Sequence, residues 1–267
     1  MSRAAQGSKT TGLIAVGGVN RSFLARMPVL LRSVGPIKAA SLGVARRIAN
    51  TLRAGEAVAN YSALADCDLI WISIPDTGLD RVFRDLAGAI PLAGKTAVLC
   101  GSTRDSDWHS SLVAAGVRVA TLNCIEESRE QIFVGEGEPI AMRELRRILS
   151  TENRKLIDLR RSSKSLYFAG VHLATDLLLP WIAASVESLR NAGLSRAEAT
   201  RVASALGTRA LRDYAKAGPK AWSAAAAHRL RQSISLDLES VREVDPRLAD
   251  LYADGVELAL RYFEPRK

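Results

Sequence analysis

The hydrophobic pattern of the chain changes near residue 160, and this change limits the possible folds more than any other feature of the sequence. Before it, short apolar runs alternate with amphipathic segments of helical length. After it, apolar residues recur only at helical spacing. Strands that alternate with helices predict right-handed βαβ units and a parallel sheet. We therefore expect a doubly wound, mostly parallel α/β domain over residues 1–160 and an all-α domain over residues 161–267.

Six short apolar runs in the first half have the length and composition of strands. They lie at residues 13–16, 37–41, 69–74, 97–100, 118–122 and 155–159. Helical patterns separate them at residues 43–53, 79–89, 105–115 and 140–149. The run 68–74 is almost entirely apolar, which is typical of a central strand covered on both faces.

The second half contains only helical patterns. The first covers residues 162–191, and Pro180 predicts a kink in it because proline removes an amide donor. Gly193 and Ser195 then break the pattern, and Glu198 stands three residues after Ser195, the spacing of a capping box. Further helices are expected at residues 196–217, 219–231, 233–244 and 246–263.

The first predicted strand runs into Gly17, Gly18, Val19 and Asn20, and a helical stretch follows. A strand that leads through glycines into a helix directs free backbone N–H groups and the positive helix end at a phosphate. Of the fingerprint G-x-G-x-x-G of Rossmann-like dinucleotide-binding domains, only the middle glycine, Gly17, is kept. We predict that this turn binds the pyrophosphate of a dinucleotide. The alternative is a glycine turn in a βαβ unit that binds nothing.

The end of the second predicted strand carries no acidic residue. NAD enzymes place an acid here to bind a ribose hydroxyl, whereas this chain has Ser41, with Arg46 and Arg47 on the next helix. A carboxylate would repel a 2′-phosphate, and Ser and Arg side chains would bind one. The sequence thus favours NADP over NAD. The alternative for Arg46 and Arg47 is a solvated helix face.

Basic residues are concentrated in the first fifth of the chain. Residues 1–55 hold nine Lys and Arg and no Asp or Glu, and this surplus accounts for the whole formal charge of +9. Binding to nucleic acid requires a contiguous basic patch. Here the charges are divided among a tail, two helices and a strand, without aromatic platforms. We therefore expect a small-molecule substrate and no nucleic-acid partner.

The remaining composition is that of a globular protein, with 48% hydrophobic residues. Cys67, Cys100 and Cys124 show no CxxC spacing, and no Cys or His pair has the spacing of metal ligands, so we expect reduced thiols and no metal. His109 and His228 are expected on helix surfaces. The apolar runs are too short to span a membrane, and no signal-peptide pattern is present. These features indicate a cytoplasmic protein.

Several short motifs together resemble a bacterial family that pairs a Rossmann-like domain with a helical domain termed DUF2520. The motifs are Ile72-Ser73-Ile74-Pro75-Asp76, Leu99-Cys100-Gly101-Ser102, Leu166-Tyr167 and Ala217-Gly218-Pro219. The family is distantly related to pyrroline-5-carboxylate, ketopantoate and 6-phosphogluconate dehydrogenases. The resemblance implies NAD(P)-linked oxidoreduction, cofactor contacts at Ile74, Pro75 and Asp76, and a homodimer formed through the C-terminal helices.

The chain also departs from the family pattern. A family His-Thr-Ser-Gly turn reads Cys100-Gly101-Ser102-Thr103 here, and a His-Pro reads Leu122-Asn123. The family Tyr-His is Tyr167-Phe168, and a following Ser-Asn is Thr175-Asp176. Two histidines that could handle protons are therefore missing from their family positions. The alternative to an oxidoreductase is a catalytically degenerate protein that keeps the fold for ligand binding or interaction.

Candidate catalytic residues come from both predicted domains. Strand ends of a doubly wound sheet line the ligand crevice, which places Ser102 and Asn123 there. The first helix of the second domain adds Tyr167, His172 and Asp176. His172 and Asp176 are four residues apart and share a helix face, where the carboxylate would orient and charge the imidazole. We expect this pair to protonate the alkoxide formed by hydride transfer, in a cleft between the domains. The alternative is an ordinary surface pair.

Overall fold

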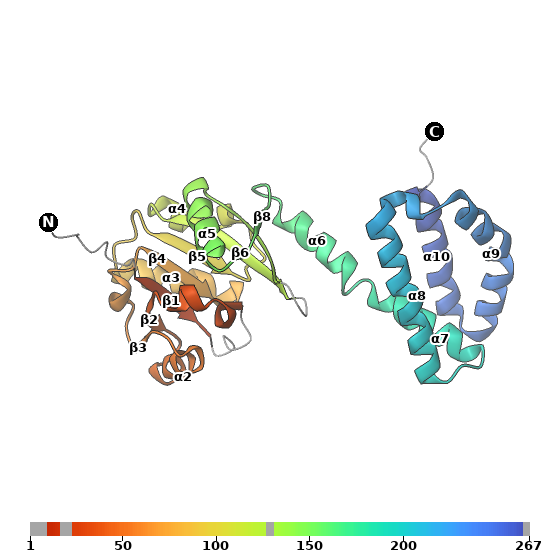
Figure 1. Cartoon of the computed structure of the whole chain (residues 1–267), viewed down its shortest axis with the longest axis horizontal. Helices are drawn as coiled ribbons and strands as arrows, with labels where there is room; N and C mark the ends of the chain where they lie inside the picture. The colour runs from red at the N-terminus through yellow and green to blue at the C-terminus, as the bar shows by residue number, and fades with distance from the viewer. Residues whose placement is uncertain (1–9, 17–22, 127–130, 264–267) are drawn as a thin grey trace. The chain divides into compact units, whose positions relative to one another are not determined.

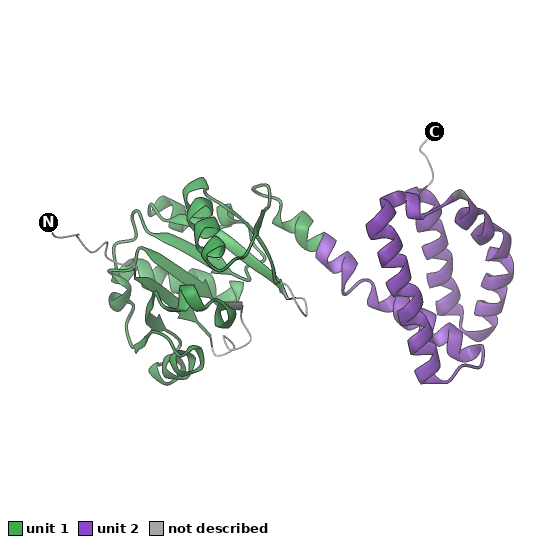
Figure 2. Ribbon diagram, viewed as in Figure 1, with its two compact units in different colours: residues 1–169 green, residues 170–267 purple. Residues whose placement is uncertain are grey.

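The computed structural model describes residues 10–16, 23–126 and 131–263. The chain forms two compact units, Met1–Ala169 and Gly170–Lys267 (Figure 2). The boundary between them lies within one helix, α6 (Lys164–Ala174). Each unit is therefore a continuous stretch of the chain, and the two are described separately below.

The first unit is built on one eight-stranded sheet, with strand order β3-β2-β1-β4-β5-β6-β7-β8 (Figure 1). All neighbouring strands are parallel except β6 and β7. The strands are β1 (Thr11–Ala15), β2 (Val34–Lys38), β3 (Glu56–Val58), β4 (Leu69–Ser73), β5 (Thr96–Cys100), β6 (Arg118–Glu126), β7 (Gln131–Gly137) and β8 (Leu156–Asp158). The chain builds outward from β1 to β3, returns to β4, and then builds toward the other edge. This order confirms the predicted doubly wound, mostly parallel sheet.

Helices cover both faces of the sheet (Figure 1). They are α1 (Pro28–Leu31), α2 (Leu42–Leu52), α3 (Asp76–Ala89), α4 (Ser110–Ala114) and α5 (Pro139–Thr151), with 3-10 turns at Phe23–Arg26, Tyr61–Leu64 and Ser106–Trp108. Trp71 of β4 packs in the core shared with α2 and α5. Its neighbours Ile70 and Ile72 pack in the core shared with α3 and α4. Strand β4 is thus buried on both faces, as its apolar run predicts.

The second unit is entirely helical among its described residues, as expected. It contains α7 (Leu179–Asn191), α8 (Arg196–Ala217), α9 (Ala224–Val244) and α10 (Pro246–Phe263), with a 3-10 turn at Gly218–Ala221. The predicted capping box is present at the start of α8, where the Ser195 hydroxyl accepts from the Glu198 N–H and the Glu198 carboxylate accepts from the Ser195 N–H.

The long helix predicted over residues 162–191 is divided into α6 and α7. Pro180 lies in the first turn of α7, where its missing N–H costs nothing, so it begins a helix instead of kinking one. Among the described residues, the segment Lys164–Asn191 alone is long and apolar enough to cross a membrane, because an 18-residue window within it has a mean hydropathy of 1.3. This corrects the expectation that no apolar run approaches that length. The structure divides this segment between α6 and α7, and none of its apolar window is buried.

Candidate functional site

A cavity of about 390 Å³ lies at the carboxyl ends of β1, β2 and β4. The residues that line it include Ala15 and Val16 after β1, Lys38 and Ala39 at the end of β2, and Pro75 after β4. Strand order reverses between β1 and β4, since the chain continues from β1 toward one edge and from β4 toward the other. Dinucleotides bind at such a switch point in doubly wound sheets.

The predicted cofactor residues separate into three groups. Ile74 and Pro75 line this cavity, and Asp76 begins α3 beside it. Gly17, Gly18, Val19 and Asn20 lie outside the described residues. Ser41, Arg46 and Arg47 are not among the residues that line the cavity. The Ser41 hydroxyl caps α2 by accepting from the Val44 N–H at 3.3 Å, and both arginines are exposed.

Two basic residues line the cavity: Lys38, at the end of β2, and Arg81, which is paired with Asp85. The ammonium group of Lys38 lies 4.9 Å from the centre of the Tyr61 ring and donates to the Ala39 carbonyl. Sequence reasoning counted Lys38 only as part of the basic surplus. The signal that identifies it is its position as the last residue of the second strand, where NAD enzymes carry an acid.

A second polar cluster, which we call the Lys164 cluster, surrounds the fully buried side chain of Lys164. The ammonium group donates to the Ser102 carbonyl at 2.5 Å, and the Lys164 N–H donates to Asp105 Oδ1 at 3.0 Å. Burial lowers the pKa of Lys164 to about 8, against the opposing charges of Glu136, Asp76 and Asp105. Lysines are normally solvated, so a buried ammonium at a strand end is a candidate for proton transfer.

Two oxygens near Lys164 are buried and make no hydrogen bond. Asp76 uses Oδ2 to accept from the N–H and the hydroxyl of Thr103, at 2.9 and 2.6 Å, and leaves Oδ1 unpartnered. Burial acts to raise the pKa of Asp76, but the hydrogen bonds from Thr103 and the charge of Lys164 hold this pKa below its ordinary value. Asn123 donates to the Ser102 carbonyl at 3.2 Å and leaves Oδ1 unpartnered. The predicted residues Ser102, Asn123 and Asp76 therefore do converge.

Glu136 and His109 complete the buried polar surroundings. Glu136 is only 1% exposed and accepts from the N–H and hydroxyl of Ser106, at 2.7 and 2.8 Å, and from the Thr121 hydroxyl at 2.8 Å. His109 is buried edge-on against Phe83, and neither ring nitrogen has a hydrogen-bond partner. Burial lowers the pKa of His109. The expectation that His109 is superficial is therefore wrong.

The candidate catalytic residues predicted on the first helix of the helical domain are Tyr167, His172 and Asp176. Tyr167 is half-buried, three residues after Lys164 on α6, with its ring 5.1 Å from that of Phe168. His172 Nδ1 and Asp176 Oδ2 are 2.9 Å apart and both side chains are exposed within the second unit. The pair forms as its spacing predicts, and its catalytic role stays a prediction. Among the described residues no cluster of His, Cys, Asp and Glu could hold a metal.

The sequence analysis placed the domain boundary near residue 160 and did not single out Lys164. The available signal was a single lysine that opens a helix whose next ten residues carry no Asp, Glu, Lys or Arg. A lysine in that position has no acidic partner on its own helix. Its contacts must come from residues of other elements, which the local sequence does not reveal.

Solved structures share this architecture, although no family model and no curated protein matches the chain. A candidate NADP oxidoreductase from Bacteroides fragilis superposes with a TM-score of 0.71 at 15% identity, covering 94% of this chain and 98% of that one. A reductive aminase from Aspergillus terreus, in complex with NADPH, gives 0.65 at 14% identity, with 95% and 93% covered. A pyrroline-5-carboxylate reductase from Coxiella burnetii gives 0.59 at 11% identity, with 96% and 97% covered.

These likenesses extend over both units and define the class of fold. The chain has the fold of these Rossmann-like oxidoreductases, a mostly parallel sheet followed by a helical C-terminal region. At this level of identity the likeness concerns the fold, and the function has to be argued from the residues of the site.

Proposed function

We propose that this protein is an NADP(H)-dependent reductase of a small carbonyl or imine compound, with Lys164 as the proton donor. One observation carries the proposal: a fully buried lysine lies at the carboxyl edge of a doubly wound sheet, on the edge that also holds the cavity at the β1–β4 switch point. This edge is where ligands of such sheets bind.

The residues around the cavity fit a nicotinamide dinucleotide. Lys38 supplies a positive charge at the end of β2, and the small side chains of Ala39 and Ala40 follow it. The acidic residue in the lining, Asp85, is paired with Arg81 at 3.8 Å. These features favour a cofactor with a 2′-phosphate, because an ammonium–phosphate contact is a charge-assisted hydrogen bond. When bound, such a cofactor supplies or accepts a hydride.

Lys164 is suited to give a proton to the atom that gains negative charge during reduction. Its pKa of about 8 lies near neutral pH, where general acids are most effective. The Ser102 carbonyl fixes the ammonium group, and the charges of Glu136 and Asp76 favour its protonated form. The unpartnered oxygens of Asp76 and Asn123 would accept hydrogen bonds from an amine, hydroxyl or carboxamide.

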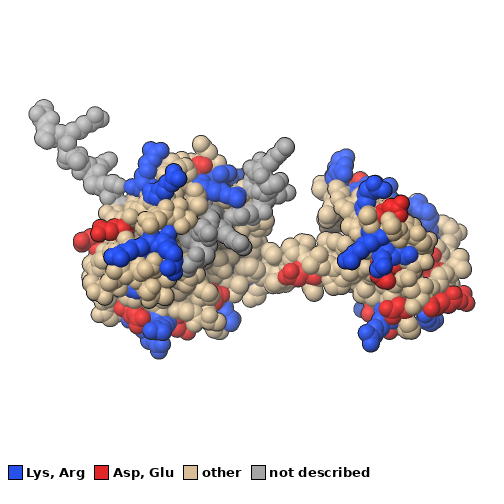
Figure 3. Space-filling model, turned by 90° about the horizontal axis from the view of Figure 1, so that it is seen from below, with Lys and Arg blue, Asp and Glu red and all other residues tan. Residues whose placement is uncertain are grey.

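The partner is then a small molecule. On the face shown in Figure 3, Lys and Arg side chains are interspersed with Asp and Glu, which supports a small-molecule partner over nucleic acid.

The test is a reductase screen with NADPH, using ketones alone and ketones mixed with amines. Lys164→Met should lower kcat/KM by about 10²–10⁴ while leaving NADPH binding intact. Lys155→Met, which removes an exposed lysine of the same unit, should change neither.

The pH profile gives an independent readout. Because the ammonium form is the acid, the reduction rate of the wild type should fall as the pH rises through about 8. The Lys164→Met protein should lack this decline. The proposal fails if NADPH does not bind, or if Lys164→Met retains both the rate and the pH profile.

A further inference from the structure

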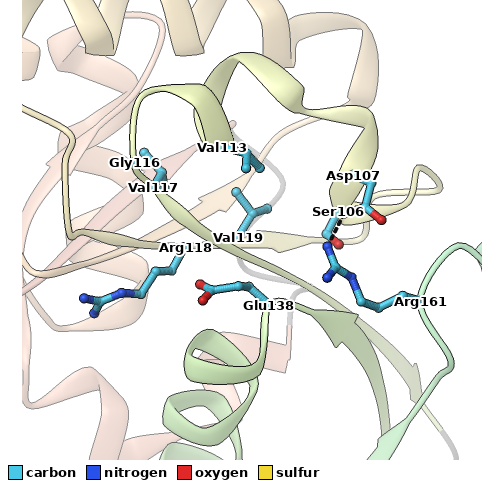
Figure 4. Close-up of a pocket in the computed structure, with 9 residues that line it drawn as sticks. All are labelled: Ser106, Asp107, Val113, Gly116, Val117, Arg118, Val119, Glu138 and Arg161. Carbon is cyan, nitrogen blue, oxygen red and sulfur yellow. Dashed lines mark hydrogen bonds and ion pairs between the residues drawn. The ribbon is translucent and has the colours of Figure 1, made fainter.

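A separate cavity of about 360 Å³ lies in the first unit, between α4, the start of β6 and the start of α5 (Figure 4). Val113, Val117 and Val119 form its apolar wall, and Arg118, Glu138 and Arg161 bring charges to it. We call it the α4–α5 cavity. It shares no lining residue with the cavity at the β1–β4 switch point. Arg118 opens β6, whereas Asn123 of the Lys164 cluster lies farther along that strand.

Two of its charged side chains have no partner. Arg118 is half-buried, and its guanidinium group makes no hydrogen bond or ion pair with any described residue. The Glu138 side chain is half-buried too, and its Oε2 atom is fully buried without a hydrogen bond. The two are not paired with each other, although both line the same cavity. Burying a charged oxygen without a partner is unfavourable. The geometry therefore calls for a cationic or hydrogen-bonding group beside Glu138.

The other two charged residues of the cavity compensate each other. Arg161 forms an ion pair with Asp107, which also lines the cavity. In the view of Figure 4 the Glu138 carboxylate lies between the side chains of Arg118 and Arg161. The uncompensated charges are thus the guanidinium group of Arg118 and the carboxylate of Glu138, which line the same cavity as the valines without pairing with each other.

We propose that the α4–α5 cavity binds a small zwitterion with an aliphatic side chain, of the class of the aliphatic α-amino acids. The ligand carboxylate pairs with Arg118, its ammonium group pairs with Glu138, and its side chain packs on the valines. The volume lies within the range of small-molecule sites, roughly 300–1,000 Å³. A phosphate-bearing ligand fits poorly because Glu138 and Asp107 would repel it, and a simple cation fits poorly because of Arg118.

The test uses L-leucine as the probe, with full-length protein and isothermal titration calorimetry. Two analogues separate the contacts: isopentylamine lacks the carboxylate, and 4-methylpentanoate lacks the ammonium group. Leucine should bind saturably, and each analogue should bind at least about tenfold more weakly, because each loses a charge-assisted hydrogen bond.

Variants of the protein assign the site. Arg118→Gln and Glu138→Gln should each weaken leucine binding by about tenfold or more. Arg147→Gln, which removes an exposed arginine of α5, should leave it unchanged. Circular dichroism of each variant establishes that it is folded, and either informative variant suffices if the other does not fold.

Three results would overturn the proposal. The first is the absence of saturable leucine binding. The second is binding that neither Arg118→Gln nor Glu138→Gln affects. The third is binding of 4-methylpentanoate as tight as that of leucine, which would indicate a simple anion site. None of these results bears on NADPH binding or on Lys164, because neither Arg118 nor Glu138 lines the cavity at the β1–β4 switch point or belongs to the Lys164 cluster.

Discussion

Under the proposed function, Lys38 is the side chain that we expect to distinguish the two nicotinamide dinucleotides. It lines the cavity at the β1–β4 switch point, whereas Arg46 and Arg47 do not. Lys38→Met should weaken NADPH binding by about 1.5–3 kcal/mol, the cost of one charge-assisted hydrogen bond, and leave NADH binding nearly unchanged. Calorimetry with both cofactors measures this.

Arg46→Ala and Arg47→Ala serve as the comparison for Lys38→Met. Both residues are exposed on α2, and we expect small effects from them. The contrary result is that Arg46→Ala or Arg47→Ala reduces the preference for NADPH and Lys38→Met does not. In that case the 2′-phosphate site is the one predicted from the sequence, and the role proposed here for Lys38 is wrong.

His109 should make the stability of the protein depend on pH. Its buried ring is kept neutral because burial lowers its pKa, whereas in the unfolded chain it takes up a proton near pH 6.5. The unfolded state therefore binds more protons below that pH, so the stabilisation is complete above about 6.5 and is lost as the pH falls. Urea unfolding at several pH values should show a smaller loss in His109→Phe than in the wild type.

The exposed His228 provides the matched control for this measurement. His228→Phe should keep the pH dependence of the wild type. Identical pH dependence in His109→Phe and the wild type would show that the buried ring does not cause it.

At the scale of single elements, strand β7 shows how tertiary contacts override local sequence. It contains Gly135 and Gly137, which weaken a strand pattern, and the charged Glu136 between them. A Cβ at Gly135 would lie 2.7 Å from the Thr121 carbonyl oxygen, so the neighbouring strand requires glycine there. Glu136 is tolerated because Ser106 and Thr121 satisfy its carboxylate. None of these partners can be recognised from the local sequence, and β7 was not predicted.

Gly135→Ala should therefore destabilise the fold by about 1–3 kcal/mol, the usual cost of overpacking. Gly88→Ala is the matched control, because a Cβ at Gly88 in α3 meets nothing within 4 Å. That change should stabilise by about 0.5–1 kcal/mol, since alanine is the better helix former. Urea denaturation measures both changes. A Gly135→Ala protein as stable as the wild type would refute the steric argument.

The candidate site, like strand β7, could be predicted only in part from the sequence. Ser102, Asn123 and Asp76 could be predicted to converge because Ser102 and Asp76 follow parallel strands and Asn123 follows the part of β6 that pairs in parallel with β5. Lys164 was not predicted as a site residue. It is identified by its complete burial and by its hydrogen bond to the Ser102 carbonyl, and the hydrophobic pattern of the sequence reveals neither. Arg46 and Arg47 do not line the cavity, and their predicted role stays a prediction, because a helix face cannot be oriented from charge alone.

At the scale of the whole molecule, the helical unit leaves much apolar surface uncovered. Leu173, Leu177 and Leu179, on and between α6 and α7, are 66%, 53% and 61% exposed. A mostly apolar cavity of about 490 Å³ lies within the unit, lined by residues that include Trp181 and Trp222. Large exposed apolar patches mark interfaces. We propose that these helices form a homodimer, and obligate dimers bury ~2,000 Å² or more.

Light scattering tests the dimer directly. The wild type should have twice the mass of the chain at micromolar concentration, and a double variant, Leu173→Arg with Leu179→Arg, should shift it to the monomer. Ile157→Arg, at an exposed apolar position of β8, should leave the mass unchanged. A monomeric wild type would remove the basis for the proposal.

The position of the unit boundary within α6 has a further consequence for inheritance. Because each unit is one uninterrupted segment, a single recombination event after residue 169 would exchange the whole helical unit and leave the sheet intact. Lys164 would remain with the sheet, and His172 and Asp176 would leave with the helices. Lys164 and the His172–Asp176 pair, the two candidate proton donors, can therefore be inherited separately. A chimaera joined after residue 169 would show which of the two is required for catalysis.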